Sequence, residues 1–395
     1  MSDGIRDFAV VLATVAACLA GAGIPSPLYG LYRAEHHFGI LAQTLLFATY
    51  AVALLPALIV AGRWTARVDG RWMTASGVCL VLGADAAFVW DRSLPVLFAA
   101  RAAQGIGIGV VNAAVAVLAL ERHPRSDTRA AALGTALATA AGLGVGCVSA
   151  GVWAQYWPQP LLWPYVGHAV VLAVMLILIG RLGRGATAHT APGRPVEWNR
   201  SRFRTSCAAA FLAWSLGGLF LAVAPALSGA ALGTTNLAVA AGTVGIFFLA
   251  SAAGQYTVGS GRAGPQPDDV GLWALFLGCC ALLAAAASGW AAVLLLSAVV
   301  GGFGLGATFT TTLAVVNRLV PPARRGRLLP IYFASVFGGT ALPVVAVGAA
   351  ALRLPLAAAV IAYAAITGCG VAVLIARAAW RRGFARRARS GDRPA

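Results

Sequence analysis

Apolar stretches of about 20 residues recur twelve times along the chain, separated by short polar segments. A helix of that length crosses the roughly 30 Å hydrocarbon core of a bilayer. Charged residues make up only 10% of the sequence, whereas a soluble protein has about 25%, so there is too little polar surface for a water-soluble globule. The sequence therefore predicts an all-α polytopic membrane protein. We place its transmembrane helices at 8–31, 41–61, 72–90, 94–120, 130–153, 161–180, 205–228, 235–258, 270–288, 291–317, 329–351 and 355–379.

Arginine is distributed unevenly between the two sides of the predicted membrane. With an inner N-terminus, the inner segments carry 25 of the 29 basic residues, whereas the outer loops carry only Arg33, Arg92 and Arg353. Cytoplasmic loops are enriched in this way, so we expect a multi-pass cell-membrane protein with both termini in the cytoplasm. All the basic residues are arginine, which fits a GC-rich bacterial genome and hence a bacterial inner membrane. The net charge of +17 thus reflects topology, and we expect no nucleic-acid partner.

A long polar segment at 181–204 divides the chain near its middle and is typical of a cytoplasmic linker. A shift of 197 residues aligns GIGIG at 105–109 with GFGLG at 302–306, which indicates an internal repeat. The basic tail is expected to bind anionic lipids of the inner leaflet. We therefore predict an N-terminal six-helix bundle (1–180), the linker (181–204), a C-terminal six-helix bundle (205–379) and the tail (380–395).

The fourth predicted span contains a charged residue within RAAQGIGIGVVN. At 3.6 residues per turn, Arg101, Gly105, Gly109 and Asn112 share one helix face. A charge near this depth costs at least about 2.5 kcal/mol unless it is solvated or paired. Two explanations stay open. Arg101 either extends towards the outer surface or has a purely structural role, or it takes part in transport, as the neighbouring Gln104 and Asn112 favour.

The same segment resembles a fourth-helix motif of the major facilitator superfamily, R-x-x-Q-G-x-G. Arg101, Gln104, Gly105 and Gly107 match it position by position. The resemblance extends to the twelve spans, the two halves and the central linker. It implies the major facilitator fold, with two pseudo-symmetric six-helix bundles, and a transporter similar to the drug/proton antiporters. In that family the arginine is implicated in proton coupling.

The fifth span resembles the superfamily's antiporter motif, G-x-x-x-G-P-x-x-G-G. Gly142, Gly146 and Gly151 match it, while Cys147 stands in place of the proline and Ala150 in place of a glycine. Small residues in a row also permit close helix contact. The motif therefore has two possible meanings here, antiport or packing alone.

The loop after the second span resembles a third motif, G-x-x-x-D-R-x-G-R-[RK]. Gly62 and Arg67 keep their places, Ala66 occupies the aspartate position, and Asp69 comes three residues later. The motif's aspartate would pair with arginines and with the N-terminus of a neighbouring helix, which would hold one conformation. The sequence leaves open whether Asp69 takes that role.

Asp85 is the only acidic residue well inside a predicted span. It lies close to the depth of Arg101, which permits a buried ion pair, although we favour a hydrated aspartate near the outer interface. Arg101, Gln104 and Asp85 are our candidates for proton coupling or gating.

We expect the substrate site near the middle of the membrane, between the halves. The resemblance implies that the first, fourth, seventh and tenth helices line it. Few charges in such a cavity suit a lipophilic or uncharged small molecule. Its candidate polar and aromatic residues are Tyr50, Asn112, Trp214, Ser215, Thr308, Thr311, Thr312 and Tyr332.

Together these features predict a secondary transporter that works by alternating access and exports its substrate in exchange for protons. The nearest alternative is an uncoupled facilitator or importer of the same fold, and a membrane receptor or integral membrane enzyme is a more distant one. The internal repeat and the lack of loop residues suited to nucleophilic or metal chemistry disfavour an enzyme. We expect a monomer without cofactor or metal, and a solvated outer loop at Glu35, His36 and His37.

Overall fold

The computed structural model describes residues 3–65, 67–91, 93–125, 127–183, 198–261, 267–321 and 324–390. Within these residues all regular structure is helical, and twelve stretches are long and apolar enough to cross a membrane. The all-α class with twelve spans is thus confirmed. The helices are α1 (Asp3–Gly23), α2 (Pro25–His36), α3 (Ile40–Trp64), α4 (Gly70–Trp90), α5 (Leu94–Arg122), α6 (Thr128–Tyr156), α7 (Trp163–Gly180), α8 (Arg200–Ala222), α9 (Ala224–Leu232), α10 (Leu237–Gly259), α11 (Pro267–Ser288), α12 (Ala291–Leu319), α13 (Arg325–Ala350) and α14 (Leu356–Ser390).

Two predicted spans are interrupted at a proline. α1 and α2 form one span with a break just before Pro25, and α9 follows α8 after a break at Val223, two residues before Pro225. Proline lacks the backbone N–H that a helix interior needs, but it fits the first turn of a new helix. Hydropathy alone does not reveal these breaks, because the sequence stays apolar through them.

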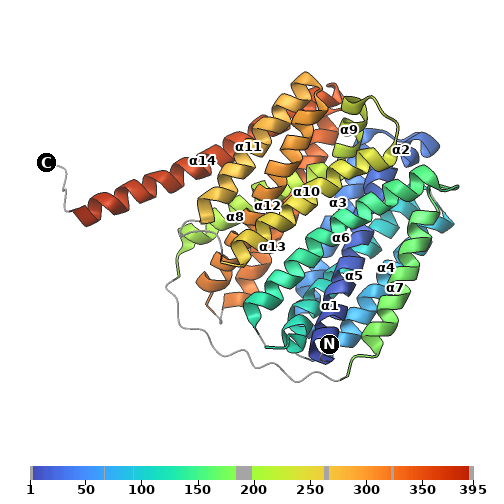
Figure 1. Cartoon of the computed structure of the whole chain (residues 1–395), viewed down its shortest axis with the longest axis horizontal. Coiled ribbons are helices and arrows are strands. Elements are labelled where there is room, and N and C mark those ends of the chain that lie inside the picture. Colours follow the sequence, from blue (N-terminus) through green and yellow to red (C-terminus); the bar gives the residue numbers. More distant parts are fainter. Residues whose placement is uncertain are drawn as a thin grey trace.

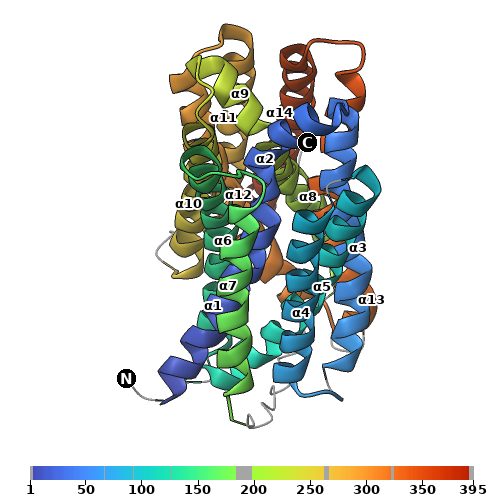
Figure 2. The same ribbon diagram turned by 90° about the vertical axis from the view of Figure 1, so that its right-hand side faces the viewer.

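The helices form two groups that follow the order of the chain, blue to green and yellow to red in Figure 1. Figure 2 shows that most of them run roughly parallel to a common axis. In the first group α5 packs against α3 and α4, and α1 packs against α6. In the second group α12 packs against α10 and α11, and α13 packs against α8. The two groups meet mainly where α6 contacts α10 and where α3 contacts α13.

Glycines of the internal repeat make equivalent contacts in the two groups. A Cβ at Gly105 of α5 would overlap the carbonyl oxygen of Tyr50 on α3, and a Cβ at Gly302 of α12 would overlap that of Phe247 on α10. Gly105 and Gly302 are 197 residues apart in the sequence, and so are Tyr50 and Phe247. Because glycine has no side chain, these helix backbones can touch. The same relation holds one turn further along, between Gly109 and Leu54 and between Gly306 and Ser251.

The predicted linker lies largely outside the described residues, which end after α7 at 183 and resume at 198. The predicted tail begins at 380, but α14 continues without a break to Ser390. We call the side that carries the α3–α4 and α5–α6 loops and the end of α7 the linker face. The other side, with the α2–α3, α4–α5 and α6–α7 loops, is the opposite face.

Candidate functional site

A cavity of about 640 Å³ lies between the two groups of helices. Its walls come from α1, α3, α5 and α6 in the first group and from α8, α10, α12 and α13 in the second. At one end the lining reaches Gly62 and Thr65, where α3 finishes, and Asn317, near the end of α12. The cavity therefore opens at the linker face.

Hydrogen bonds between the two groups close the cavity at the opposite face. The hydroxyl of Ser26 on α2 donates to the carbonyl oxygen of Leu221 on α8. Nε2 of Gln43 on α3 donates to the carbonyl oxygen of Ala222 at 2.8 Å. These four residues are buried, so the contacts are shielded from water and hold the halves together at this face.

The cavity wall is mostly apolar and aromatic. The indole of Trp214 on α8 and the ring of Phe309 on α12 meet edge to face, with centroids 5.5 Å apart. Among the described residues that line the cavity, Arg63 at the mouth is the only charged one. Polar groups come from a few positions, which include Asn112, Ser251, Gln255, Asn317 and the threonines 128, 135 and 139.

The lining includes three of the eight residues predicted for it: Tyr50, Asn112 and Trp214. The other five lie outside it. The hydroxyl of Ser215 accepts a hydrogen bond from Tyr363 at 3.1 Å, and the hydroxyls of Thr312 and Tyr332 lie 2.9 Å apart. Thr308 and Thr311 are not part of the lining either. The hydroxyls of Ser215, Thr312 and Tyr332 thus join helices of the second group.

The face that α12 presents to the cavity explains this difference. Phe309, Leu313 and Asn317 are four residues apart and line the cavity, while Thr308 and Thr312 lie on a neighbouring face rotated by about 100° per residue. The sequence analysis missed Asn317, Gln255 and the cavity-facing threonines of α6. Spacings of seven and four residues between Thr128, Thr135 and Thr139 are the signal that indicates such a face.

Arg101 is fully buried, with 1% of its surface exposed. Nη1 donates to Oε1 of Gln104 at 2.5 Å, and Nε donates to the carbonyl oxygen of Leu46 on α3 at 3.4 Å. Nε2 of Gln104 then donates to the carbonyl oxygen of Gly21 on α1 at 2.9 Å. The side chain is held between helices, so the explanation in which it extends to the outer surface is wrong.

The guanidinium of Arg101 also lies behind the cavity wall. Its Cζ atom is 4.9 Å from the ring centroid of Tyr50 and 5.9 Å from that of Phe47, and both rings line the cavity. A cation at this distance from an aromatic face is attracted to the ring electrons. Arg101 therefore contacts the site through aromatic side chains.

Asp85 pairs with a histidine that the sequence analysis did not single out. Its Oδ2 lies 2.7 Å from Nδ1 of His168 on α7. Asp85 is 1% exposed, so the prediction of a hydrated aspartate is wrong, and so is the prediction of a pair with Arg101. Asp85 pairs with His168 because its position on α4 directs the side chain towards α7. His168 is the only histidine inside a predicted span, and that signal would have found it.

Comparison with known proteins decides the family. The sequence profile of the Major Facilitator Superfamily matches residues 10–267. The chain belongs to the major facilitator superfamily. Its structure is similar to a crystal structure of an aspartate-to-alanine mutant of the nucleoside transporter NupG, with a TM-score of 0.69 and 13% sequence identity, covering 93% of this chain and 96% of that one. At this identity the similarity establishes the fold alone. No curated protein sequence matches the chain.

The glycines that resemble the superfamily's antiporter motif lie in helix contacts. Cβ atoms at Gly142 and Gly146 of α6 would overlap the backbone of Ala16 and Ala20 on α1. Gly151 meets α10 instead, where a Cβ would lie 2.7 Å from the carbonyl oxygen of Leu237. These glycines therefore allow α6 to pack closely against α1 in the first half and against α10 in the second half.

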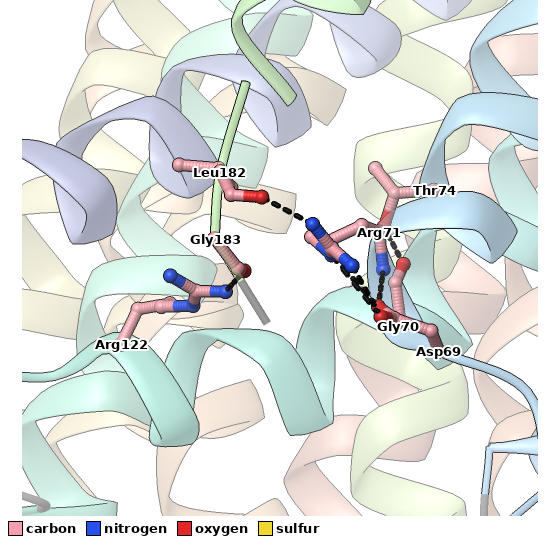
Figure 3. Close-up of polar contacts among 7 residues, drawn as sticks. All are labelled: Asp69, Gly70, Arg71, Thr74, Arg122, Leu182 and Gly183. Atoms are coloured by element: carbon pink, nitrogen blue, oxygen red, sulfur yellow. Dashed lines mark hydrogen bonds and ion pairs between the residues drawn. The ribbon is translucent and has the colours of Figure 1, made fainter. Parts of the chain in front are cut away.

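The superfamily's loop motif is represented by a pair at the start of α4. The carboxylate of Asp69 accepts hydrogen bonds from the backbone N–H of Arg71 at 2.9 Å and from its Nη2 at 2.7 Å (Figure 3). Hydrogen bonds from Arg71 lower the pKa of Asp69 below its usual range. Asp69 thus caps its own helix, and its described contacts lie within the first half. Gly62 lines the mouth of the cavity, and Arg67 follows it in the loop, while Ala66 lies outside the described residues.

Arginines at the linker face hold the end of α7. The guanidinium of Arg71 donates to the carbonyl oxygen of Leu182, and that of Arg122 donates to the carbonyl oxygen of Gly183 (Figure 3). Arg122 also pairs with Asp7 of α1 at 2.6 Å. These contacts join α1, α4, α5 and α7 where the chain leaves the first group.

Proposed function

We propose that this member of the major facilitator superfamily exports a small, lipophilic or uncharged molecule in exchange for protons. The superfamily profile and the fold are those of a transporter rather than an enzyme. The observation that carries the proposal is the cavity between the halves, open at one face and closed by hydrogen bonds at the other. Alternating access needs such a site, open to one side at a time.

The direction of export rests on the distribution of arginine. The linker face carries most of the arginines of the inner segments, and positive residues favour the cytoplasmic side. With that orientation both termini lie in the cytoplasm, and the open cavity receives its substrate from inside the cell. The basic tail then lies at the inner leaflet, where anionic lipids attract it, and the transporter acts as a monomer.

The nature of the substrate rests on the cavity wall. A volume of about 640 Å³ lies within the range of roughly 300–1,000 Å³ that holds a drug-sized ligand. Trp214, Phe309 and Tyr50 offer aromatic faces, while Asn112 and Gln255 offer hydrogen bonds. An apolar molecule with one or two polar groups fits this wall, and a strongly charged one would be poorly solvated in it.

Proton coupling rests on the buried polar groups behind this wall. Arg101, Gln104 and Asp85 are buried, and ionisable groups inside a membrane protein mark ion or proton pathways. We therefore assign proton coupling to this buried network.

A vesicle experiment tests the proposal. The full chain is reconstituted in liposomes, a pH gradient is imposed in either direction, and the movement of a panel of lipophilic dyes is followed. Coupled export predicts that the gradient drives dye movement and that Arg101→Ala abolishes the gradient's effect. Movement that ignores the gradient would favour the facilitator, and no movement of any dye would contradict the proposed substrate class.

A further inference from the structure

The Asp85–His168 pair lies inside the first half, behind α1. Asp85 comes from α4, His168 comes from α7, and the two side chains are 1% and 5% exposed. Nε2 of His168 lies 2.8 Å from the carbonyl oxygen of Ala17 on α1. Neither residue lines the cavity. The function described so far does not use the histidine.

Both ring nitrogens of His168 face acceptor oxygens, and these two contacts determine how many protons the pair holds. Nδ1 faces the Asp85 carboxylate at 2.7 Å and Nε2 faces the Ala17 carbonyl at 2.8 Å. A neutral imidazole carries a single N–H, which satisfies only one of these contacts. The second contact needs a further proton between Nδ1 and Oδ2, on either atom. The observed geometry is therefore that of a protonated pair with no net charge.

The surroundings of the pair favour this neutral form. Oδ1 of Asp85 is buried and has no hydrogen-bond partner among the described residues. A carboxylate charge with an unpartnered oxygen is costly to bury. The other titratable side chains that interact with Asp85 are Cys18 of α1 and Tyr165 of α7, and Tyr165 in turn contacts Tyr32 of α2.

An aromatic layer separates the pair from the opposite face. The rings of Phe88 and Tyr165 stack with centroids 4.7 Å apart, and Tyr165 accepts a hydrogen bond from Tyr32 at 3.0 Å. Phe88 and Tyr165 each lie three residues from a member of the pair, one turn along the same helix. Water from the opposite face is thereby kept from the site.

Helix α1 connects the pair with the Arg101 network and with the cavity. The carbonyl of Ala17 faces His168, and that of Gly21, one turn on, accepts from Gln104. A Cβ at Gly21 would lie 2.7 Å from Cε1 of His168, so the helix backbone rests against the imidazole. Another face of α1 lines the cavity through Val15, Leu19 and Ala22.

We propose that Asp85 and His168 form the proton-binding site of this transporter, and that α1 carries its protonation state to the cavity wall. This inference rests on the proposed proton antiport. Release of the proton leaves one N–H for two acceptors, so one of the contacts at 2.7 Å or 2.8 Å becomes repulsive. Either α1 loses its hold on His168 or Asp85 loses its partner, and in both cases the cavity wall is free to shift.

Spectroscopy on the purified full chain tests the site without any substrate. Selective ¹⁵N labelling makes the five histidines visible by NMR, and His168→Gln identifies the His168 signals. We expect the His168 signals to change with pH as the pair releases its proton. In Asp85→Asn no carboxylate shares the proton, so the signals of a neutral imidazole should persist over the same pH range. A His168 signal that stays constant with pH in the unsubstituted protein would overturn the proposal.

Transport assays then test the coupling. His168→Gln keeps an N–H donor for the Ala17 carbonyl, and thermal unfolding checks that it is folded. In liposomes we expect dye exchange at equal pH to persist in His168→Gln and in Asp85→Asn, while the part driven by a pH gradient is lost. The matched control is His37→Asn, at an exposed position with φ 52° where asparagine is well tolerated; it should keep both activities. Gradient-driven movement retained in His168→Gln would contradict the proposal. If the unsubstituted protein moves no dye in either mode, the proposed transport of lipophilic molecules fails, and the NMR titration still decides whether the pair binds a proton.

Discussion

Nε2 of Gln43 on α3 donates to the carbonyl oxygen of Ala222 on α8 at 2.8 Å, across the boundary between the two halves. Gln43 is 3% exposed and Ala222 is 1% exposed, so water does not compete for this bond. The contact exists only while the opposite face is closed. It therefore contributes to the difference in free energy between this conformation and one that opens at the opposite face.

Replacing Gln43 with leucine should weaken the closed opposite face. The Ala222 carbonyl would stay buried without a donor, which costs about 1–3 kcal/mol and corresponds to a population shift of about 5- to 150-fold. Distances between spin labels at the tips of α2 and α9 measure this shift, with longer distances expected. Thr49→Val is the matched control on α3, because the Thr49 hydroxyl bonds only its own helix at Leu45. Equal distance distributions in the two variants would contradict the role of Gln43.

A bulky side chain inside the cavity should block transport without affecting the fold. Ala136 of α6 lines the cavity, so Ala136→Trp places an indole where the substrate would lie, and transport should fall by at least about tenfold. Val145 of the same helix is 63% exposed and does not line the cavity. The variant Val145→Trp should therefore transport normally. Dye movement in liposomes is the measurement. Normal transport by Ala136→Trp would mean that the substrate takes another route.

A methyl group at Gly146 should destabilise the first half. A Cβ there would overlap the carbonyl oxygen of Ala20, and forced separation of packed helices costs about 1–3 kcal/mol. The unfolding temperature of Gly146→Ala in detergent should fall accordingly. Gly242 of α10 has open space around it, so Gly242→Ala should be neutral or gain up to about 1 kcal/mol. The α1–α6 contact would have little importance if both variants unfolded at the same temperature.

The Asp69–Arg71 pair should make stability depend on pH in the acid range. The pKa of Asp69 is lowered, chiefly by the hydrogen bond from the Arg71 side chain, so its stabilisation is fully present above the unfolded-state value of about 4. It is lost as the pH falls through the lower pKa of the folded state. Asp69→Asn keeps an N-cap residue but should show a smaller loss of stability from about pH 5 downward.

Thermal unfolding measured as a function of pH tests this prediction. Arg71→Gln should reduce the acid-dependent loss as Asp69→Asn does, and the double variant should add little because the two residues act together. Acid sensitivity unchanged in both single variants would show that other carboxylates account for it.

The twelve spans were predictable because the bilayer fixes how long an apolar helix must be. The glycine contacts were predictable for a related reason, since small residues that repeat at helical spacing leave room for a backbone. Gly105 and Gly302 make the same contact in the two halves, as their 197-residue separation indicates.

The partners of polar residues were not predictable, because hydropathy gives the depth of a residue but not the direction in which its helix turns it. Asp85 and Arg101 have similar expected depths, yet Asp85 faces His168 and Arg101 faces Gln104. The threonines of α12 show the same limit: Phe309 lines the cavity and Thr308, one residue before it, does not. A step of one residue turns the side-chain direction by about 100°. An error of one residue in choosing the cavity-facing positions therefore selects the wrong helix face.

The glycine contacts repeated in the two halves also determine what kind of motion the molecule can make. Backbones that already touch leave no space between α3 and α5 or between α10 and α12, so each of these pairs moves as one rigid unit. Helices α5, α6 and α12 each have 29 residues and are about 43 Å long. A tilt of only about 10° around the opposite face would displace their far ends by about 7 Å. Such a tilt would narrow the mouth at the linker face while the contacts of Gln43 and Ser26 keep the opposite face closed.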